Sequence, residues 1–89
     1  MNNKTVIESL SMDLLRAAVG YHKGSLAVAR RFSQEALKRE KEIDEKKIKP
    51  YFKRVLREIK DTLNSESDKI AEDALMYFVL CKNYAKKFT

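Results

Sequence analysis

A chain of 89 residues forms at most one domain, and a domain of this size buries only about 60–65% of its unfolded surface. Its net charge of +6, its 36% of charged residues and its few glycines and prolines are typical of a basic helical protein with little material for strands. The single cysteine, Cys81, excludes an internal disulfide and a cysteine-based zinc cage. The longest apolar run, Ala74–Cys81, is too short for a bilayer span of about 20 residues, and the N-terminus lacks the apolar segment of a signal peptide, so we expect a cytoplasmic protein.

The first half of the chain carries one apolar stripe that passes through both glycines. At 100° per residue, apolar side chains over Ile7–Ile43 share an arc of about 80°, with the same phase on both sides of Gly24. Thr5–Glu8 fits a capping box for a helix that begins at about residue 6. These patterns predict one helix over about 6–46, in which Gly20 and Gly24 permit a close backbone approach.

The alternative is that this helix ends at the glycines. His22 and Lys23 would then place cations near the C-terminal end of the helix dipole, and Gly24 would follow the last helical turn. Ser25 would cap a second helix. The sequence leaves this alternative open.

Pro50 marks the start of the second helical half. Proline suits the first position of a helix and forces Lys49 out of the α region, which predicts a turn at about 44–50 and a helix over about 50–88. The apolar side chains of this half again share one arc of about 80°, which only Glu66 interrupts. Turn and cap residues at 64–67 leave one helix or two as alternatives.

The two stripes predict a single all-α domain over 1–89, either an antiparallel helical hairpin or an up-down helical bundle. A two-helix hairpin covers only one face of each helix, so dimerisation would complete a four-helix bundle; two breaks would instead give a compact four-helix monomer. Ala74–Cys81 is apolar on all sides, which favours a homodimer. The side chains expected at the dimer interface are Leu75, Met76, Val79 and Leu80.

Basic side chains form two groups that predict nucleic-acid binding. The first group lies opposite the apolar stripe and comprises Arg16, Lys23, Arg30, Arg31, Lys38 and Lys41. The second group surrounds the turn and comprises Lys46, Lys47, Lys49, Lys53, Arg54, Arg57 and Lys60, with Tyr51 and Phe52 beside it as rings for stacking. Such rows neutralise phosphates and release counterions, although solvated helix faces share this composition and no nucleic-acid-binding motif accompanies them.

Few residues qualify for catalysis or metal binding. His22 is the single histidine and has no acidic residue three positions before it, and Cys81 lies within an apolar stripe. The segment from Arg16 to His22 resembles the Arg-x(4–6)-His motif of HEPN-type RNases, which would imply that both residues act on RNA. In this chain the motif falls in the first helix, Ala17 replaces a polar residue, and the two side chains lie about 120° apart.

The sequence therefore predicts a small non-enzymatic helical protein that acts through self-association and protein interaction, without cofactor, metal or membrane. A nucleic-acid-binding accessory protein is the alternative, and a HEPN-like RNase is the second alternative.

Overall fold

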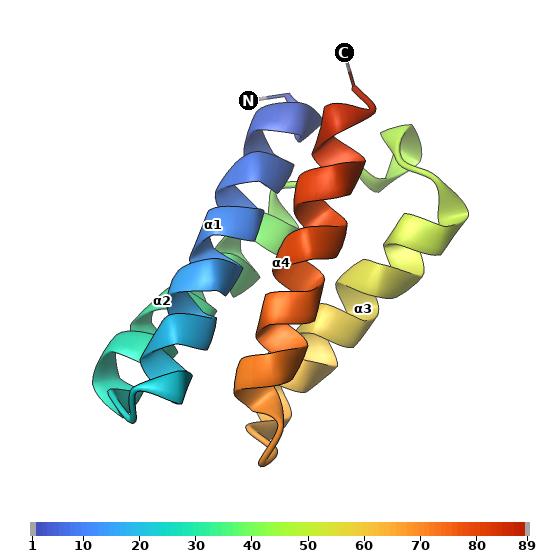
Figure 1. Ribbon diagram of the computed structural model, residues 1–89. Coiled ribbons are helices and arrows are strands. Elements are labelled where there is room, and N and C mark those ends of the chain that lie inside the picture. Colours follow the sequence, from blue (N-terminus) through green and yellow to red (C-terminus); the bar gives the residue numbers. More distant parts are fainter. Residues whose placement is uncertain (1, 89) are drawn as a thin grey trace.

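The computed structural model describes residues 2–88, and these form an all-helical fold without strands (Figure 1). The elements are α1 (Asn3–His22), α2 (Leu26–Lys41), the short 3-10 helix η1 (Glu45–Lys47), α3 (Pro50–Ser65) and α4 (Ile70–Lys86). Successive α-helices run in alternate directions along a body of 36 × 20 × 19 Å. The start of α1, the end of α4 and η1 therefore lie at the same end of the molecule (Figure 1). The all-α class is confirmed.

The prediction of one continuous helix over about 6–46 is wrong, because the chain reverses at Gly24. This glycine adopts a left-handed φ of 76°, which an L side chain rarely adopts. The Gly24 N–H donates to the Tyr21 carbonyl at 3.2 Å, and the Ser25 N–H donates to the Gly20 carbonyl at 2.8 Å. This pair of bonds is the Schellman motif that ends a helix.

The apolar stripe predicted after the turn coincides only in part with the buried face of α2, where Ala36 of the stripe is fully buried. Val28 belongs to the predicted stripe yet is 48% exposed, whereas Ala29 and Ser33 are buried on α2. The reason is the close contact between α1 and α2. A Cβ atom on Gly20 would lie 2.9 Å from the Ala29 Cα, so the predicted close backbone approach occurs at this glycine. Small residues take the contact, and the larger Val28 is left at the surface.

The start of α1 also differs from the prediction. The helix begins at Asn3, and the cap is Asn2, whose Oδ1 accepts the Thr5 N–H at 2.9 Å, so the capping box over Thr5–Glu8 does not form. The side chain of Asn3 is buried and holds the loop after α2. Its Nδ2 donates to the Asp44 carbonyl at 3.0 Å, and its Oδ1 accepts the Asp44 N–H at 2.9 Å.

The second half follows the two-helix alternative. Lys49 is extended and Pro50 is the first residue of α3, as the sequence predicts. The α3 helix ends at Ser65, and Glu66 adopts a left-handed conformation with a φ of 46°. Four helices therefore come from one chain, and a second chain is not needed to supply them.

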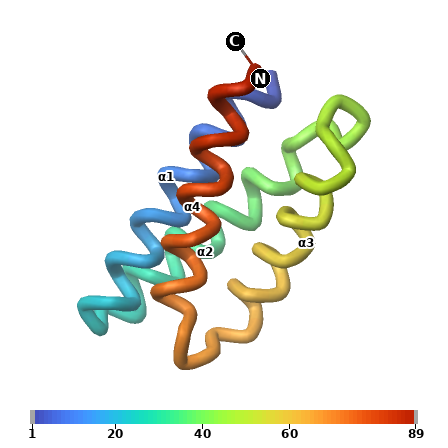
Figure 2. Tube along the Cα trace, turned by 45° about the vertical axis from the view of Figure 1, so that its right-hand side comes forward, coloured from blue at the N-terminus to red at the C-terminus, as the bar shows by residue number. Residues whose placement is uncertain are grey.

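The core lies between the four helices. The largest fully buried side chains are Phe52, Ile7, Leu10, Leu14, Leu56, Ile59, Val6 and Cys81. The backbone of α3 runs apart from that of α4 (Figure 2), and the residues that α3 buries are large: Phe52, Leu56, Ile59 and Leu63. Within residues 2–88, no helix is long and apolar enough to cross a membrane.

Candidate functional site

The four side chains predicted for a dimer interface point outward along α4. Leu75, Met76, Val79 and Leu80 are 42–48% exposed. Leu75 also lines an apolar depression of about 420 Å³, which it shares with Val19 and His22 of α1. We call these four residues the α4 apolar face.

The first predicted basic group does not form a continuous row. Arg16, Lys23 and Arg30 are seven residues apart and would line up on one continuous helix, but Lys23 caps the end of α1 and α2 runs back beside it. Arg16 and Arg31 both lie 5.6 Å from the centre of the Phe32 ring. Lys38 pairs with Glu35 at 3.7 Å, and Lys41 is exposed in the last turn of α2.

The second predicted basic group divides into two parts. Lys53, Arg54, Arg57 and Lys60 occur on α3 alongside its buried residues, and the last three are exposed. The other three lysines gather at the end of the molecule around a depression of about 390 Å³. We call this the lysine–tyrosine pocket, and its lining residues are Lys46, Lys47, Ile48, Lys49, Tyr51, Tyr84, Lys87 and Phe88.

Aromatic rings form the floor of the lysine–tyrosine pocket. Tyr84 is buried and stacks on Phe52, with ring centroids 4.0 Å apart. It also makes T-shaped ring contacts with Tyr51 and Phe88, whose ring centroids lie 5.6 and 5.3 Å from its own. Its hydroxyl accepts the Lys49 N–H at 2.9 Å, which fixes the entry into α3. Tyr51 is 46% exposed, and the Lys87 ammonium lies 5.8 Å from its ring centre.

The electrostatic character of this pocket is uniformly positive. Four lysines line it, no acidic residue does so, and none of the four forms an ion pair with a carboxylate of residues 2–88. The α3 helix begins at the pocket, with no acidic residue in its first turn and no side-chain cap. The positive end of the helix dipole therefore adds to the lysine charges.

Sequence reasoning missed Lys87 and Phe88 as pocket residues. Only the break at Glu66 brings the end of α4 beside the start of α3, so these residues would have been found from the two-helix alternative. Lys4 was also missed. It lines a neighbouring depression of about 390 Å³ together with Asn2, Asn3, Asp44, Lys47 and Phe88.

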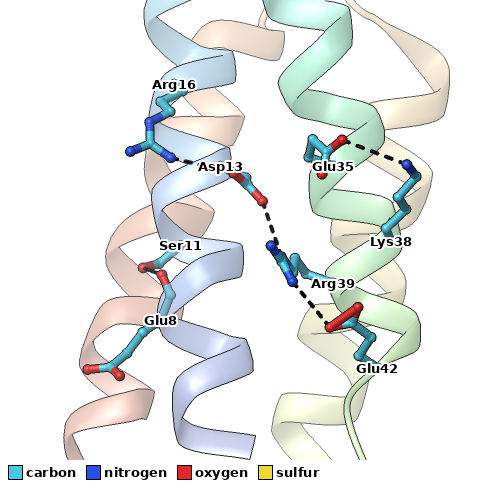
Figure 3. A network of polar contacts seen from close by, with 8 residues as sticks. All are labelled: Glu8, Ser11, Asp13, Arg16, Glu35, Lys38, Arg39 and Glu42. Carbon is cyan, nitrogen blue, oxygen red and sulfur yellow. Dashed lines mark hydrogen bonds and ion pairs between the residues drawn. The ribbon is translucent and has the colours of Figure 1, made fainter. Parts of the chain in front are cut away.

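A second polar group unforeseen from the sequence joins α1 to α2 (Figure 3). The buried Asp13 lies 3.7 Å from an Arg16 nitrogen and 3.9 Å from the Arg39 Nε. Both distances exceed a hydrogen bond. Burial therefore outweighs the attraction of Arg39 and Arg16 and raises the pKa of Asp13 above its ordinary value of 3.8. We interpret this group as a contact between helices.

Glu66 ties the α3–α4 turn to the first helical pair. Its carboxylate accepts two hydrogen bonds from Arg30, at 2.9 and 3.2 Å, and one from the Tyr21 hydroxyl at 2.7 Å. Hydrogen bonds from Arg30 and then from Tyr21 lower the pKa of Glu66 from its ordinary value of 4.5. A residue that seemed to interrupt the apolar stripe thus forms a contact across the turn.

Replacing Glu66 with Gln should reduce the free energy of unfolding at pH 7. The pKa of Glu66 is lower in the folded chain than in the unfolded chain. The contribution of its carboxylate to the free energy of unfolding is therefore complete above about pH 4.5 and is lost as the pH falls through the pKa of the folded chain. Urea denaturation from pH 7 to pH 3 measures this difference between Glu66→Gln and the wild type. The exposed Glu58→Gln serves as the control. A difference that stays constant down to the lowest pH would contradict the assignment.

The two residues of the HEPN-like motif do not face a common cavity. Arg16 is directed to Asp13 and Phe32, whereas His22 lines the depression between α1 and α4. Burial raises the pKa of the Cys81 thiol to about 12, so this cysteine is not a thiolate at neutral pH. No group of three or more potential ligands from His, Cys, Asp and Glu is placed to hold a metal ion in the described part of the chain.

No protein-family model, curated protein or solved structure matches this chain. Inferences about function therefore depend on the α4 apolar face and the lysine–tyrosine pocket.

Proposed function

We propose that this protein is a non-enzymatic helical module that self-associates and binds other proteins through the α4 apolar face. The observation that carries the proposal is the row of half-exposed Leu75, Met76, Val79 and Leu80 on one helix. Spacings of one, four and five residues place them on adjoining lines along the helix surface. Full burial of each would contribute about 0.7–1.4 kcal/mol, roughly half the value of a completely exposed side chain.

The charges that flank this row suit an antiparallel pairing of two α4 helices. Glu72 lies in the first turn of α4 and Lys82 lies toward its end, and both are exposed. A two-fold axis near the middle of the row would bring Glu72 of one copy close to Lys82 of the other. The same face could accept a different protein helix with a similar distribution of charge.

Sedimentation velocity and light scattering test this proposal. We expect a mass near twice that of the monomer at micromolar concentration and at least about a tenfold weaker association for Met76→Lys. The variant should remain helical, because four helices of one chain already share a core. Met12→Lys is the matched control, since Met12 is exposed to a similar extent on α1.

Charge reversal tests the orientation separately. Glu72→Lys and Lys82→Glu should each weaken association, and the double variant should restore it because the opposite charges again meet. A monomeric mass at every concentration would show that the protein does not self-associate. Equal effects of Met12→Lys and Met76→Lys would show that the α4 apolar face is not the contact.

A further inference from the structure

The lysine–tyrosine pocket lies at the end of the molecule, away from the α4 apolar face, and has a different chemistry. We propose that it binds a nucleotide unit, in which lysines hold the phosphate and the exposed rings stack on the base. This inference goes beyond self-association and does not depend on it.

Phosphate is the anion that the charges of this pocket favour. Lys46, Lys47, Lys49 and Lys87 come from η1, its flanking loop and the segment after α4, so they approach one volume from several directions. The Lys87 ammonium donates a hydrogen bond to the Tyr51 hydroxyl at 3.4 Å, and none of the four exposed lysines pairs with a carboxylate of residues 2–88, so their charges can neutralise a phosphate. Pro50 has no N–H, and the Phe52 and Lys53 N–H groups donate to the Lys49 carbonyl at 3.0 and 3.2 Å, so the start of α3 contributes the positive end of its dipole and not a set of free N–H donors.

The rings of the pocket provide the second half of the recognition. Tyr51 is 46% exposed although it adjoins the buried Tyr84, which holds it in place through an edge contact. An exposed ring on a rigid aromatic base stacks on any nucleobase, because every base has a π face. Tyr51 and Phe88 line the same depression as the lysines.

The volume and surroundings of the pocket define the size of the ligand. About 390 Å³ lies within the range of small-molecule sites and accommodates one nucleotide. The neighbouring depression shares Lys47 and Phe88 with it and contains Lys4, which allows a strand to continue. Stacking requires an unpaired base, so the ligand is a free nucleotide or a single strand, and a duplex is disfavoured.

Binding assays with defined probes distinguish these sources. The probes are inorganic phosphate, AMP, a labelled single-stranded RNA decamer, a single-stranded DNA decamer of the same sequence, and the duplex of that DNA. Binding is measured at low salt by fluorescence anisotropy of the labelled strands and by amide chemical shifts of the protein. Shifts at the pocket residues with AMP alone indicate a free nucleotide as the source. Much tighter binding of either decamer than of AMP indicates a single strand. Either result supports the proposal.

Exposed residues permit variants that leave the fold intact. Lys47→Gln/Lys87→Gln should weaken decamer binding about tenfold or more. It should also reduce the slope of log K against log salt by up to about 1.4, because each of two lost phosphate contacts contributes about 0.7 on a single strand. The matched control is Lys23→Gln/Lys69→Gln, which removes the same charge from the α1–α2 and α3–α4 turns, and these turns lie at the opposite end of the molecule (Figure 1). Tyr51→Leu should weaken binding at least about fivefold, whereas Tyr51→Phe should retain it.

Three results would overturn the inference. The first is the absence of binding to AMP and to both single strands at low salt. The second is equal weakening by the pocket variant and its charge-matched control, which would indicate a diffuse attraction. The third is that Tyr51→Leu binds the decamers as tightly as the wild type and that the duplex binds as tightly as the single strands. This result would show that the site does not stack on a base.

Discussion

Replacing Gly20 with Val should lower the free energy of unfolding by about 2–3 kcal/mol, because the new side chain has no space. A Cβ atom at this position would lie 2.9 Å from both the Cα and the N of Ala29. These are backbone atoms, so the contact is relieved only if the whole of α2 moves. The gain in helix propensity when a glycine is replaced is at most about 1 kcal/mol and does not compensate.

Urea denaturation followed by circular dichroism measures this effect. Ala27→Val is the control, because Ala27 is exposed on α2 and a valine there meets no neighbouring helix. Ala29→Gly should not rescue the Gly20 variant, since the clash is with the Ala29 backbone and remains after its methyl group is removed. Full rescue, or a loss no greater than that of Ala27→Val, would show that α1 and α2 are not in such close contact.

Replacing Tyr84 with Ala should have a still larger effect, about 3–5 kcal/mol, because it removes a large buried ring. This ring stacks on Phe52 and meets the edges of Tyr51 and Phe88, so its loss leaves a cavity between α3 and α4. Tyr84→Phe keeps the ring and removes only the hydroxyl that accepts the Lys49 N–H. We expect that variant to lose only about 1 kcal/mol.

The comparison with Tyr51 makes this prediction specific. Tyr51→Ala changes an exposed ring in the same pocket and should cost only about 0.5 kcal/mol. Denaturation curves of the three variants therefore separate the ring that supports the fold from the ring that is available to a ligand. A similar loss for Tyr51→Ala and Tyr84→Ala would contradict this division.

Hydrophobic periodicity predicted the buried faces well where the helices pack through large side chains. Leu10 and Leu14 on α1 and Leu56 and Ile59 on α3 are at most 1% exposed. On α2 periodicity succeeded only in part, because Ala36 of the stripe is buried whereas Val28 lies at the surface. The phase of a stripe identifies a face of a helix, and it does not show whether the helix is continuous.

The turn residues contained the missing information. Gly24 after His22 and Lys23 is the signal for a helix end, and the left-handed φ of Gly24 agrees with it. The turn and cap residues at 64–67 left a break open, but nothing near Glu66 in the sequence indicates the hydrogen bonds that it accepts from Arg30 and Tyr21. The full lysine–tyrosine pocket follows from the sequence only if the chain turns at Glu66, because that turn brings Lys87 beside Lys49.

The packing of α1 against α4 joins segments from opposite ends of the sequence, and this has a consequence for biosynthesis. A ribosome-bound chain that ends before Ile70 contains α1 but none of the helix that covers one of its faces. Ile7 and Leu14, which are fully buried in the finished molecule, would lack part of their cover during this interval. The native core is therefore completed only after α4 has left the exit tunnel, and chaperones that bind exposed apolar segments should engage the chain before that point.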